Sequence, residues 1–244
     1  MERIYLGMKH SVTVRIALIS DIHANLPALD AVMNDPAFSE CERVLFAGDL
    51  VGYYYWPLEC YRSLQGLRLD AIRGNHEDML LKAIGSPAGT TVASKYGSGL
   101  KVAADELPAE AIEDIADWDH PKLLDLGGRS ILMCHGSPSD ISQYLYPDVD
   151  LPDSVTFGGS TAEIVVHGHT HYPSVRQSNG VLWINPGSVG QPRNKQPGAH
   201  WAILDTESLK VSPKISTYDY SSVVDLAKQR DPNHSYLWEV LQRT

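Results

Sequence analysis

Five short apolar runs in this chain are each followed, directly or after one glycine, by Asp, Asn or His, and this pattern constrains the fold most. The runs and their endings are TVRIALIS before Asp21-Ile22-His23, RVLFA before Gly48-Asp49, LDAIR before Gly74-Asn75-His76, RSILMC before His135-Gly136, and EIVVH before Gly168-His169-Thr170-His171. Such runs are typical of buried strands. Because ligands of open α/β sheets bind beyond the carboxyl ends of the strands, we expect these polar side chains to gather at one edge.

The first half of the chain alternates strand and helix signals. Residues 13–20, 43–47 and 69–73 have strand character, and Asn25 can cap a helix that carries Leu26 and Leu29 at helical spacing. A second helix is predicted over 57–64, and a helical stretch over about 92–118. The order βαβαβ favours a parallel sheet with helices packed on its faces.

The second half is rich in strands. The predicted strands are 122–126, 129–134, 163–167, 174–177, 181–184, 200–205 and 209–216. Gly127-Gly128 and Asn179-Gly180 favour hairpins. Residues 137–160 are Pro- and Asp-rich without periodicity, which indicates a long functional loop, and 220–230 and 236–242 are predicted closing helices. We therefore predict an α/β fold with two packed mixed β-sheets flanked by helices.

Length and composition limit the possible classes. A chain of 244 residues with 43% hydrophobic residues is predicted to form one domain over 1–244, with an N-terminal extension over 1–12 and a C-terminal helical segment over about 217–244. Twenty Lys and Arg against 30 Asp and Glu give a net charge of -10, which argues against non-specific binding to nucleic acid or anionic membranes. A bound metal ion can still reverse the sign of a small region.

The cysteines and the apolar runs indicate the compartment. Cys41, Cys60 and Cys134 are an odd number without CxxC spacing, so neither a disulfide scaffold nor a thiolate zinc finger is expected. No apolar run approaches the roughly 18 residues of a membrane span, and charged residues interrupt the N-terminus where a signal peptide is apolar. These features predict a cytoplasmic protein without a membrane segment.

The polar endings differ in strength when they are taken singly. Asp21 and His23 could be a helix cap and a surface histidine, and Asp49 could belong to an ordinary turn. His169 and His171 form the strongest pair, because residues two apart in an extended chain share a face and imidazole is a common metal ligand. The order and the strand-end placement of the whole set favour one metal site.

At this point the sequence resembles the calcineurin-like metallophosphoesterase superfamily. The matching motifs are SDIH at 20–23, GD at 48–49, GNHE at 74–77, HG at 135–136 and GHTH at 168–171. The stretches DLVGYYYWP at 49–57, CHGSP at 134–138 and INPGSVGQPR at 184–193 are similar to its small bacterial and archaeal phosphodiesterase branch. The resemblance runs from about residue 15 to residue 215, and it implies a four-layer αββα arrangement.

The resemblance also implies a dinuclear centre. One ion would be held by Asp21, His23 and His171, the other by Asn75, His135 and His169, with Asp49 shared by both. Mixed oxygen and nitrogen ligation suits Mn, Fe, Co, Ni or Zn, and manganese is the choice that the resemblance favours.

The chemistry expected of such a centre is hydrolysis of a phosphate ester. Two divalent ions bring four positive charges and the two aspartates remove two, so an anionic phosphate is attracted and a hydroxide held between the ions can attack phosphorus directly. His76 is the candidate general acid or electrostatic stabiliser, with a purely hydrogen-bonding role as the alternative. Arg73 is a candidate for phosphate binding, or equally for a structural ion pair.

Several functions stay open from sequence. We expect a phosphodiesterase acting on small or cyclic-nucleotide-like diesters; the alternatives are a phosphomonoesterase, including a protein phosphatase or dinucleoside polyphosphate hydrolase, and a non-catalytic binding module. LVGYYYWP follows Asp49, where protein phosphatases of the superfamily have VDRG, and Ala24 stands where a glycine is common. The aromatic cluster of residues 53–56 could stack a nucleoside base or pack in the core.

Overall fold

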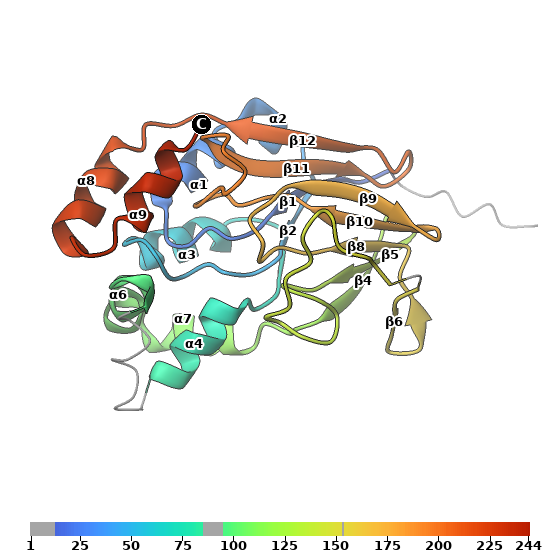
Figure 1. Cartoon of the computed structure of the whole chain (residues 1–244). Coiled ribbons are helices and arrows are strands. Elements are labelled where there is room, and N and C mark those ends of the chain that lie inside the picture. Colours follow the sequence, from blue (N-terminus) through green and yellow to red (C-terminus); the bar gives the residue numbers. More distant parts are fainter. Residues whose placement is uncertain (1–12, 85–94, 153) are drawn as a thin grey trace, which may run out of the picture.

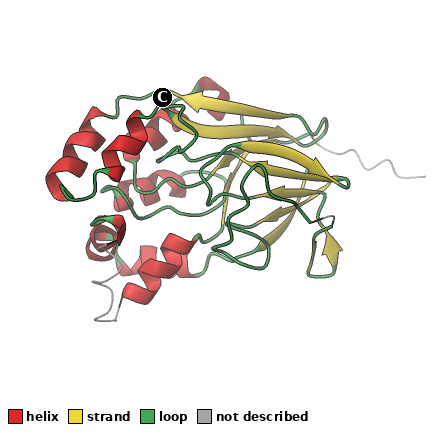
Figure 2. Cartoon of the chain, in the orientation of Figure 1, coloured by secondary structure: helices red, strands yellow, loops and turns green. Residues whose placement is uncertain are grey.

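The two predicted sheets pack face to face in the computed structural model, which describes residues 13–84, 95–152 and 154–244. The predicted extension over 1–12 and the start of the predicted helical stretch at 92–94 lie outside the described residues. The strands gather on one side of the molecule and most helices on the other (Figures 1 and 2). The predicted fold class, two packed mixed sheets with flanking helices, is confirmed.

The first sheet has the strand order β12-β11-β1-β2-β3. Its strands are β1 (Arg15–Ile19), β2 (Arg43–Phe46), β3 (Leu69–Ala71), β11 (Ala199–Asp205) and β12 (Val211–Ser216). Strands β1, β2 and β3 are parallel, whereas β11 is antiparallel to both β1 and β12. The three parallel strands therefore end at the same edge.

The second sheet has the order β4-β5-β8-β10-β9. Its strands are β4 (Lys122–Leu126), β5 (Arg129–Met133), β8 (Ile164–Val166), β9 (Ser174–Ser178) and β10 (Val181–Asn185). Strands β5, β8 and β10 are parallel, and β4 and β9 form antiparallel hairpins at the edges. The predicted glycine-containing hairpin turns are confirmed here.

The helices that precede the second sheet in the chain cover the outer face of the first sheet, and the C-terminal helices pack on residues 53–55. The helices are α1 (Leu26–Met33), α2 (Pro36–Ser39), α3 (Pro57–Gln65), α4 (Asn75–Ala83), α6 (Gly99–Glu106), α7 (Ala109–Ala116), α8 (Ser221–Arg230), α9 (Tyr236–Glu239) and the 3-10 turn η1 (Val240–Gln242). Asn25 caps α1, as predicted, by accepting a hydrogen bond from the backbone of Ala28 at 3.3 Å. No helix in the described ranges is long and apolar enough to cross a bilayer.

Alternation along β1 divides the core. Ile16 and Leu18 face the second sheet and pack with residues such as Ile131 and Ile164, whereas Ala17 and Ile19 face the helices. The outer face of the second sheet packs on the segment between β5 and β8, and Trp183 is buried there. The central strands therefore have two buried faces, which explains why β1, β2 and β8 are short apolar runs, whereas the edge strands β9 and β12 carry exposed residues.

Three local predictions need correction. Helix α4 was not predicted, because its first turn is formed by the polar GNHE motif rather than by a periodic apolar face. The long loop predicted over 137–160 contains the short strand β6 (Thr156–Phe157), which pairs with β7 (Ser160–Thr161) across Gly158 and Gly159. The predicted stretch 92–118 contains two helices, α6 and α7, which are separated at Leu107 and Pro108.

Candidate metal centre

The polar residues after the strands meet where the two sheets adjoin. Asp21 and Asp49 follow neighbouring strands of the first sheet, and the backbone N–H of His23 donates to the carbonyl of Asp49 at 3.0 Å. His169, from the second sheet, donates its backbone N–H to the carboxylate of Asp21 at 3.2 Å. The seven predicted ligand residues, Asp21, His23, Asp49, Asn75, His135, His169 and His171, are each at most 8% exposed.

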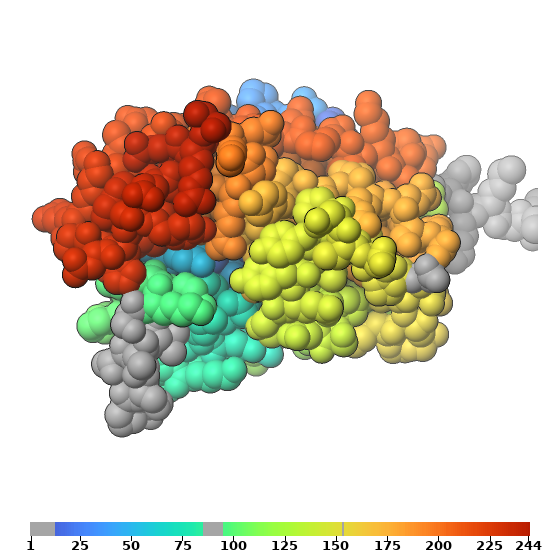
Figure 3. Space-filling view, in the orientation of Figure 1, coloured from blue at the N-terminus to red at the C-terminus, as the bar shows by residue number. Residues whose placement is uncertain are grey.

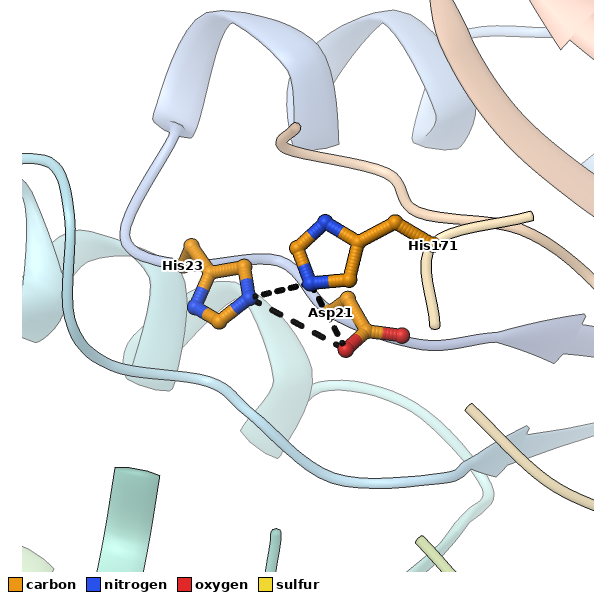
Figure 4. A group of neighbouring side chains, drawn as sticks. All are labelled: Asp21, His23 and His171. Carbon is orange, nitrogen blue, oxygen red and sulfur yellow. Dashed lines mark hydrogen bonds and ion pairs between the residues drawn. The ribbon is translucent and has the colours of Figure 1, made fainter. Parts of the chain in front are cut away.

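Asp21, His23 and His171 form the first group that could hold a cation (Figure 4). The Nε2 atoms of the two histidines lie 3.1 Å apart, and Oδ1 of Asp21 lies 3.3 Å from Nε2 of His171 and 3.8 Å from Nε2 of His23. The structure therefore brings together the three residues that the resemblance assigns to one ion.

Asp49, His135 and His169 form a second such group. Oδ2 of Asp49 lies 3.2 Å from Nε2 of His135, which is also 3.1 Å from Oδ1 of Asn75. The same carboxylate oxygen lies 3.7 Å from Nε2 of His23 in the first group. Asp49 thus stands between the two groups, where a shared ligand would be.

Backbone carbonyls determine which nitrogen of each histidine carries a proton. Three histidines donate from Nδ1: His23 to the carbonyl of Val51, His135 to that of Ala47 and His171 to that of Gln191. His169 instead donates from Nε2 to the carbonyl of Ser142, and all four distances are 2.6 to 3.0 Å. A carbonyl oxygen only accepts, so in each neutral ring the other nitrogen has a free lone pair.

These tautomers show that the residues present fit a cation. In His23 and His171 the free lone pairs are on the Nε2 atoms, which face each other at 3.1 Å. Two lone pairs at this distance repel unless a positive charge lies between them. Metal-ligating histidines ordinarily donate their second nitrogen to a carbonyl or carboxylate, as all four do here. The donor set of imidazoles, carboxylates and an amide oxygen suits a transition-metal ion.

The two carboxyl groups have opposite pKa shifts. Burial raises the pKa of Asp21 to about 7, and the negative charge of Asp49 adds to this effect. Burial also opposes ionisation of Asp49, but the neighbouring His135 outweighs it and holds the pKa of Asp49 well below its usual value. The ionised Asp49 is therefore the permanent negative charge at the centre of the cluster.

The imidazoles are mainly neutral in this environment. Burial lowers the pKa of His169 to about 4, and it lowers the pKa values of His23 and His171 well below the usual value. For His135, burial is outweighed by the carboxylate of Asp49, and its pKa rises to about 9. Neutral imidazole is the form that binds a metal ion, and a cation at the second group would replace the proton of His135.

The backbone around the cluster is held in an uncommon conformation. Asp21, His23, Asp49, His169 and His171 all have φ between 52° and 66°. Each such residue costs about 1 kcal/mol or more, and strain of this kind concentrates at functional sites. Ala24, at the position where the resemblance expects glycine, accepts the same strain with φ of 55°.

Glu77 is a site residue that the sequence analysis did not single out. Its buried carboxylate accepts hydrogen bonds from the backbone N–H groups of Gly74 at 2.7 Å, Asp49 at 2.8 Å and Val51 at 3.1 Å. Glu77 therefore ties the start of α4 to the turn that carries Asp49. The signal was its position three residues after Gly74, where a helix often carries a capping glutamate.

His76 lies beside the cluster, as its place in the sequence predicts. Its ring centroid is 4.7 Å from that of His23, its backbone N–H donates to Oδ1 of Asp49 at 2.9 Å, and its buried Nδ1 has no hydrogen-bond partner. His76 also forms a third candidate cation group with His23 and Asp49. A ring nitrogen is thus available for proton transfer or for a ligand.

Arg73 has structural partners. Its guanidinium donates to the carbonyl of Ala116, and its Nε lies 3.4 Å from the carboxylate of Asp78. These contacts join β3 to α7 and α4. The geometry favours the structural alternative, and a substrate contact by Arg73 stays a prediction.

The aromatic cluster at 53–56 divides into two parts. Tyr54 and Tyr55 pack in the core under the C-terminal helices, whereas the ring of Tyr53 packs edge-on against His23 at 4.5 Å. At the second ligand group, Tyr144 in the segment after β5 lies over His169 with ring centroids 4.1 Å apart. The segment predicted as a functional loop therefore does border the site.

Comparison with known proteins agrees with this geometry. A profile of the calcineurin-like phosphoesterase superfamily domain matches residues 14–209. An uncharacterized protein of Methanocaldococcus jannaschii is 29% identical over 238 residues, covering 89% of this chain and 93% of that protein. Phosphodiesterase YfcE of Escherichia coli K12 is 23% identical over 214 residues, covering 88% of this chain and 98% of that protein.

Solved structures share the fold. A metallophosphoesterase from Sphaerobacter thermophilus matches with a TM-score of 0.75 at 23% identity, covering 96% of this chain and all of that one. A hypothetical protein from Pyrococcus horikoshii matches with a TM-score of 0.77 at 21% identity, covering 94% of this chain and 98% of that one. Since the family profile extends over most of the sequence, the protein belongs to the calcineurin-like phosphoesterase superfamily and is a phosphoric ester hydrolase.

Proposed function

We propose that the protein is a dinuclear-metal-dependent phosphodiesterase that hydrolyses small or cyclic-nucleotide-like phosphodiesters. The observation that carries this proposal is the set of four buried histidines with backbone-determined tautomers around Asp49, which stands between the two ligand groups. The name of the Escherichia coli relative, a phosphodiesterase, supports diesters as the substrate class.

The residues divide between the two ions as the motifs suggest. Asp21, His23 and His171 would hold one ion, Asn75, His135 and His169 the other, and Asp49 would contact both. When bound, divalent ions would supply positive charge for the phosphate and lower the pKa of a bound water molecule to about 7, so that a nucleophile is available near neutral pH. Manganese is the metal that we propose.

The chain itself positions these groups and provides a candidate proton donor. Burial of the ligand residues keeps bulk water from screening the charge of the site. His76 has an unpartnered ring nitrogen beside His23, and we assign it to the leaving oxygen of the substrate. Glu77 holds the Asp49 turn in place through its three backbone hydrogen bonds.

Paired assays test this function. Protein loaded with manganese, and protein treated with a chelator, are assayed on bis(p-nitrophenyl) phosphate and on p-nitrophenyl phosphate. Metal-dependent hydrolysis with higher kcat/KM on the diester is expected. Higher kcat/KM on the monoester would replace the proposal by a phosphomonoesterase, and metal binding without hydrolysis of either ester would replace it by a binding module.

Metal content tests the assignment of the ligands. Asn75→Ala removes one amide ligand, and Asn34→Ala, at the exposed C-cap of α1, is the matched control. We expect two manganese ions per chain in the wild type and in the control, and fewer in Asn75→Ala, whose turnover is abolished. Normal turnover in Asn75→Ala would contradict the assignment of Asn75 to the second ligand group.

A cytoplasmic location stays a prediction, and the three free thiols support it.

A further inference from the structure

A pocket of about 450 Å³ lies beside the metal-ligand cluster. Its walls include Tyr53, Tyr96, Arg193 and Tyr236. In the space-filling view, blue atoms of the N-terminal third show between the red C-terminal segment and the green segment near α6 (Figure 3). Pockets of roughly 300 to 1,000 Å³ are large enough for drug-sized molecules.

The pocket and the cluster share a wall. The ring of Tyr53 lies 4.5 Å from that of His23 and 4.9 Å from that of His76, measured between centroids. Tyr96 packs edge-on against Tyr53, with ring centroids 5.9 Å apart, and lies 5.4 Å from His76 by the same measure. A molecule whose phosphate reaches the cluster can therefore place its remaining part in the pocket that these tyrosines line.

Arg193 brings a positive charge to this wall. Its terminal Nη2 donates to the hydroxyl of Tyr53 at 3.1 Å and to Oε1 of Gln191 at 3.3 Å, which are both neutral groups. Its Nε is buried and has no hydrogen-bond partner. Within the described residues no carboxylate lies at ion-pair distance from Arg193, and the charge of Asp21 acts on it only from further away.

A largely buried cation without a counter-ion is costly unless a ligand supplies the missing charge. The guanidinium group matches phosphate oxygens in shape and can donate two parallel hydrogen bonds to them. Neighbouring tyrosine rings suit a flat aromatic group, because stacking and edge contacts add to simple burial. Phosphate at Arg193 and a planar group in the pocket are thus complementary to what the walls offer.

We propose that Arg193 binds a phosphate oxygen of the substrate and that the tyrosine-lined pocket holds a nucleoside as one ester group of the diester. This proposal rests on the proposed function, because it places the phosphate next to the metal-ligand cluster. His76, which lies between the cluster and the pocket, then stands near the oxygen that leaves with the nucleoside.

Binding provides a test that does not need turnover. Adenosine 5′-monophosphate and inorganic phosphate are titrated by calorimetry into manganese-loaded and chelator-treated protein. Arg193→Gln is expected to weaken binding of both probes roughly tenfold or more, the loss of a charge-assisted hydrogen bond. Arg193→Lys keeps the positive charge but loses the planar guanidinium that donates two parallel hydrogen bonds. Arg62→Gln replaces an exposed arginine of α3 and is the matched control, which should leave both affinities unchanged.

The pocket is tested by a second pair of variants. Tyr236→Leu keeps apolar volume but removes the ring, and is expected to weaken adenosine monophosphate several-fold while phosphate affinity stays the same. Tyr236→Phe retains the ring and serves as the control. Circular dichroism and thermal unfolding of every variant show that the fold is intact.

Turnover then separates the two proposals. On thymidine 5′-(p-nitrophenyl phosphate) and methyl p-nitrophenyl phosphate, Arg193→Gln should lower kcat/KM for both esters and Tyr236→Leu for the nucleoside ester alone. If no diester is hydrolysed but the binding differences hold, the proposed function fails and the pocket assignment stands. If Arg193→Gln binds both probes within twofold of the wild type, or adenosine monophosphate binds no better than phosphate, the pocket assignment is overturned.

Discussion

Replacing Glu77 by alanine should disturb both the fold and the metal-ligand cluster, although Glu77 is not among the proposed ligands. In the native protein its carboxylate accepts three buried backbone hydrogen bonds, from Asp49, Val51 and Gly74. Alanine leaves these N–H groups without an acceptor. The turn that carries Asp49 then loses its attachment to α4.

The expected magnitude follows from the three bonds. Each unsatisfied buried N–H costs about 1 to 3 kcal/mol, and single substitutions rarely exceed about 4 to 5 kcal/mol because the structure relaxes. Burial and the nearby charge of Asp49 raise the pKa of Glu77 to about 7, so removing the carboxyl also relieves some repulsion. We expect Glu77→Ala to lower the free energy of unfolding by about 3 to 5 kcal/mol.

The variant Glu77→Gln separates the contributions of the two carboxylate oxygens to stability. Oε2 accepts from both Asp49 and Gly74, whereas Oε1 accepts only from Val51. If the amide oxygen of glutamine takes the position of Oε2, the hydrogen bonds from Asp49 and Gly74 are kept. The amide nitrogen then takes the position of Oε1, and the N–H of Val51 has no acceptor. Glu77→Gln should therefore cost about 1 to 3 kcal/mol.

The assay is urea unfolding of metal-free protein, followed by measurement of bound manganese in folded samples. Glu110→Ala, in the first turn of α7, is the matched control and should change stability by no more than about 1 kcal/mol. We expect manganese content to fall in Glu77→Ala. Stability within 1 kcal/mol of the wild type together with a full complement of manganese would refute this account of Glu77.

Three further predictions concern other parts of the site. In Gly168→Ala the added Cβ would lie 2.0 Å from Oγ of Ser20, so thermal stability and manganese content should both fall. In the control Gly66→Ala the Cβ meets no atom within 4 Å, and the manganese content of the wild type should be retained. Equal manganese content in the two variants would contradict this packing argument. Removal of metal by a chelator should lower Tm, and added manganese should restore Tm, because a ligand that binds only the folded state stabilises that state. A Tm independent of metal in scanning calorimetry would count against a resident cation. Arg73→Gln should lower stability by about 1 kcal/mol through its lost contact with Ala116 and leave KM unchanged, whereas a large rise in KM would restore the substrate-binding role.

Much of the fold and of the cluster could be predicted from local sequence. The apolar run that becomes β1 is directly followed by Asp21, and the run that becomes β2 is followed within three residues by Asp49. Parallel strands place their carboxyl ends at one edge, so the convergence of these residues needed no detailed packing. Side-chain alternation likewise assigns Ile16 and Ala17 to opposite faces of the first sheet.

Other features depended on contacts between residues distant in sequence. The tautomer of His171 is determined by the carbonyl of Gln191, and that of His169 by the carbonyl of Ser142. Arg73 could bind phosphate or form an ion pair by its sequence alone, and only the position of the last residue of α7 beside its side chain provides its carbonyl partner. Such partners have no periodic signal in the chain.

By itself, the sequence determined which donor atoms stand at the ends of which strands, because strand direction and residue order are local properties. Only the tertiary structure decided which nitrogen of each histidine is free, that Glu77 holds the Asp49 turn, and that Arg193 lies beside a tyrosine-lined pocket with no carboxylate of the described residues at ion-pair distance. Those properties arise where loops from both sheets and the C-terminal helices meet. Burial and hydrogen bonding there depend on the whole packed surface and not on neighbours along the chain.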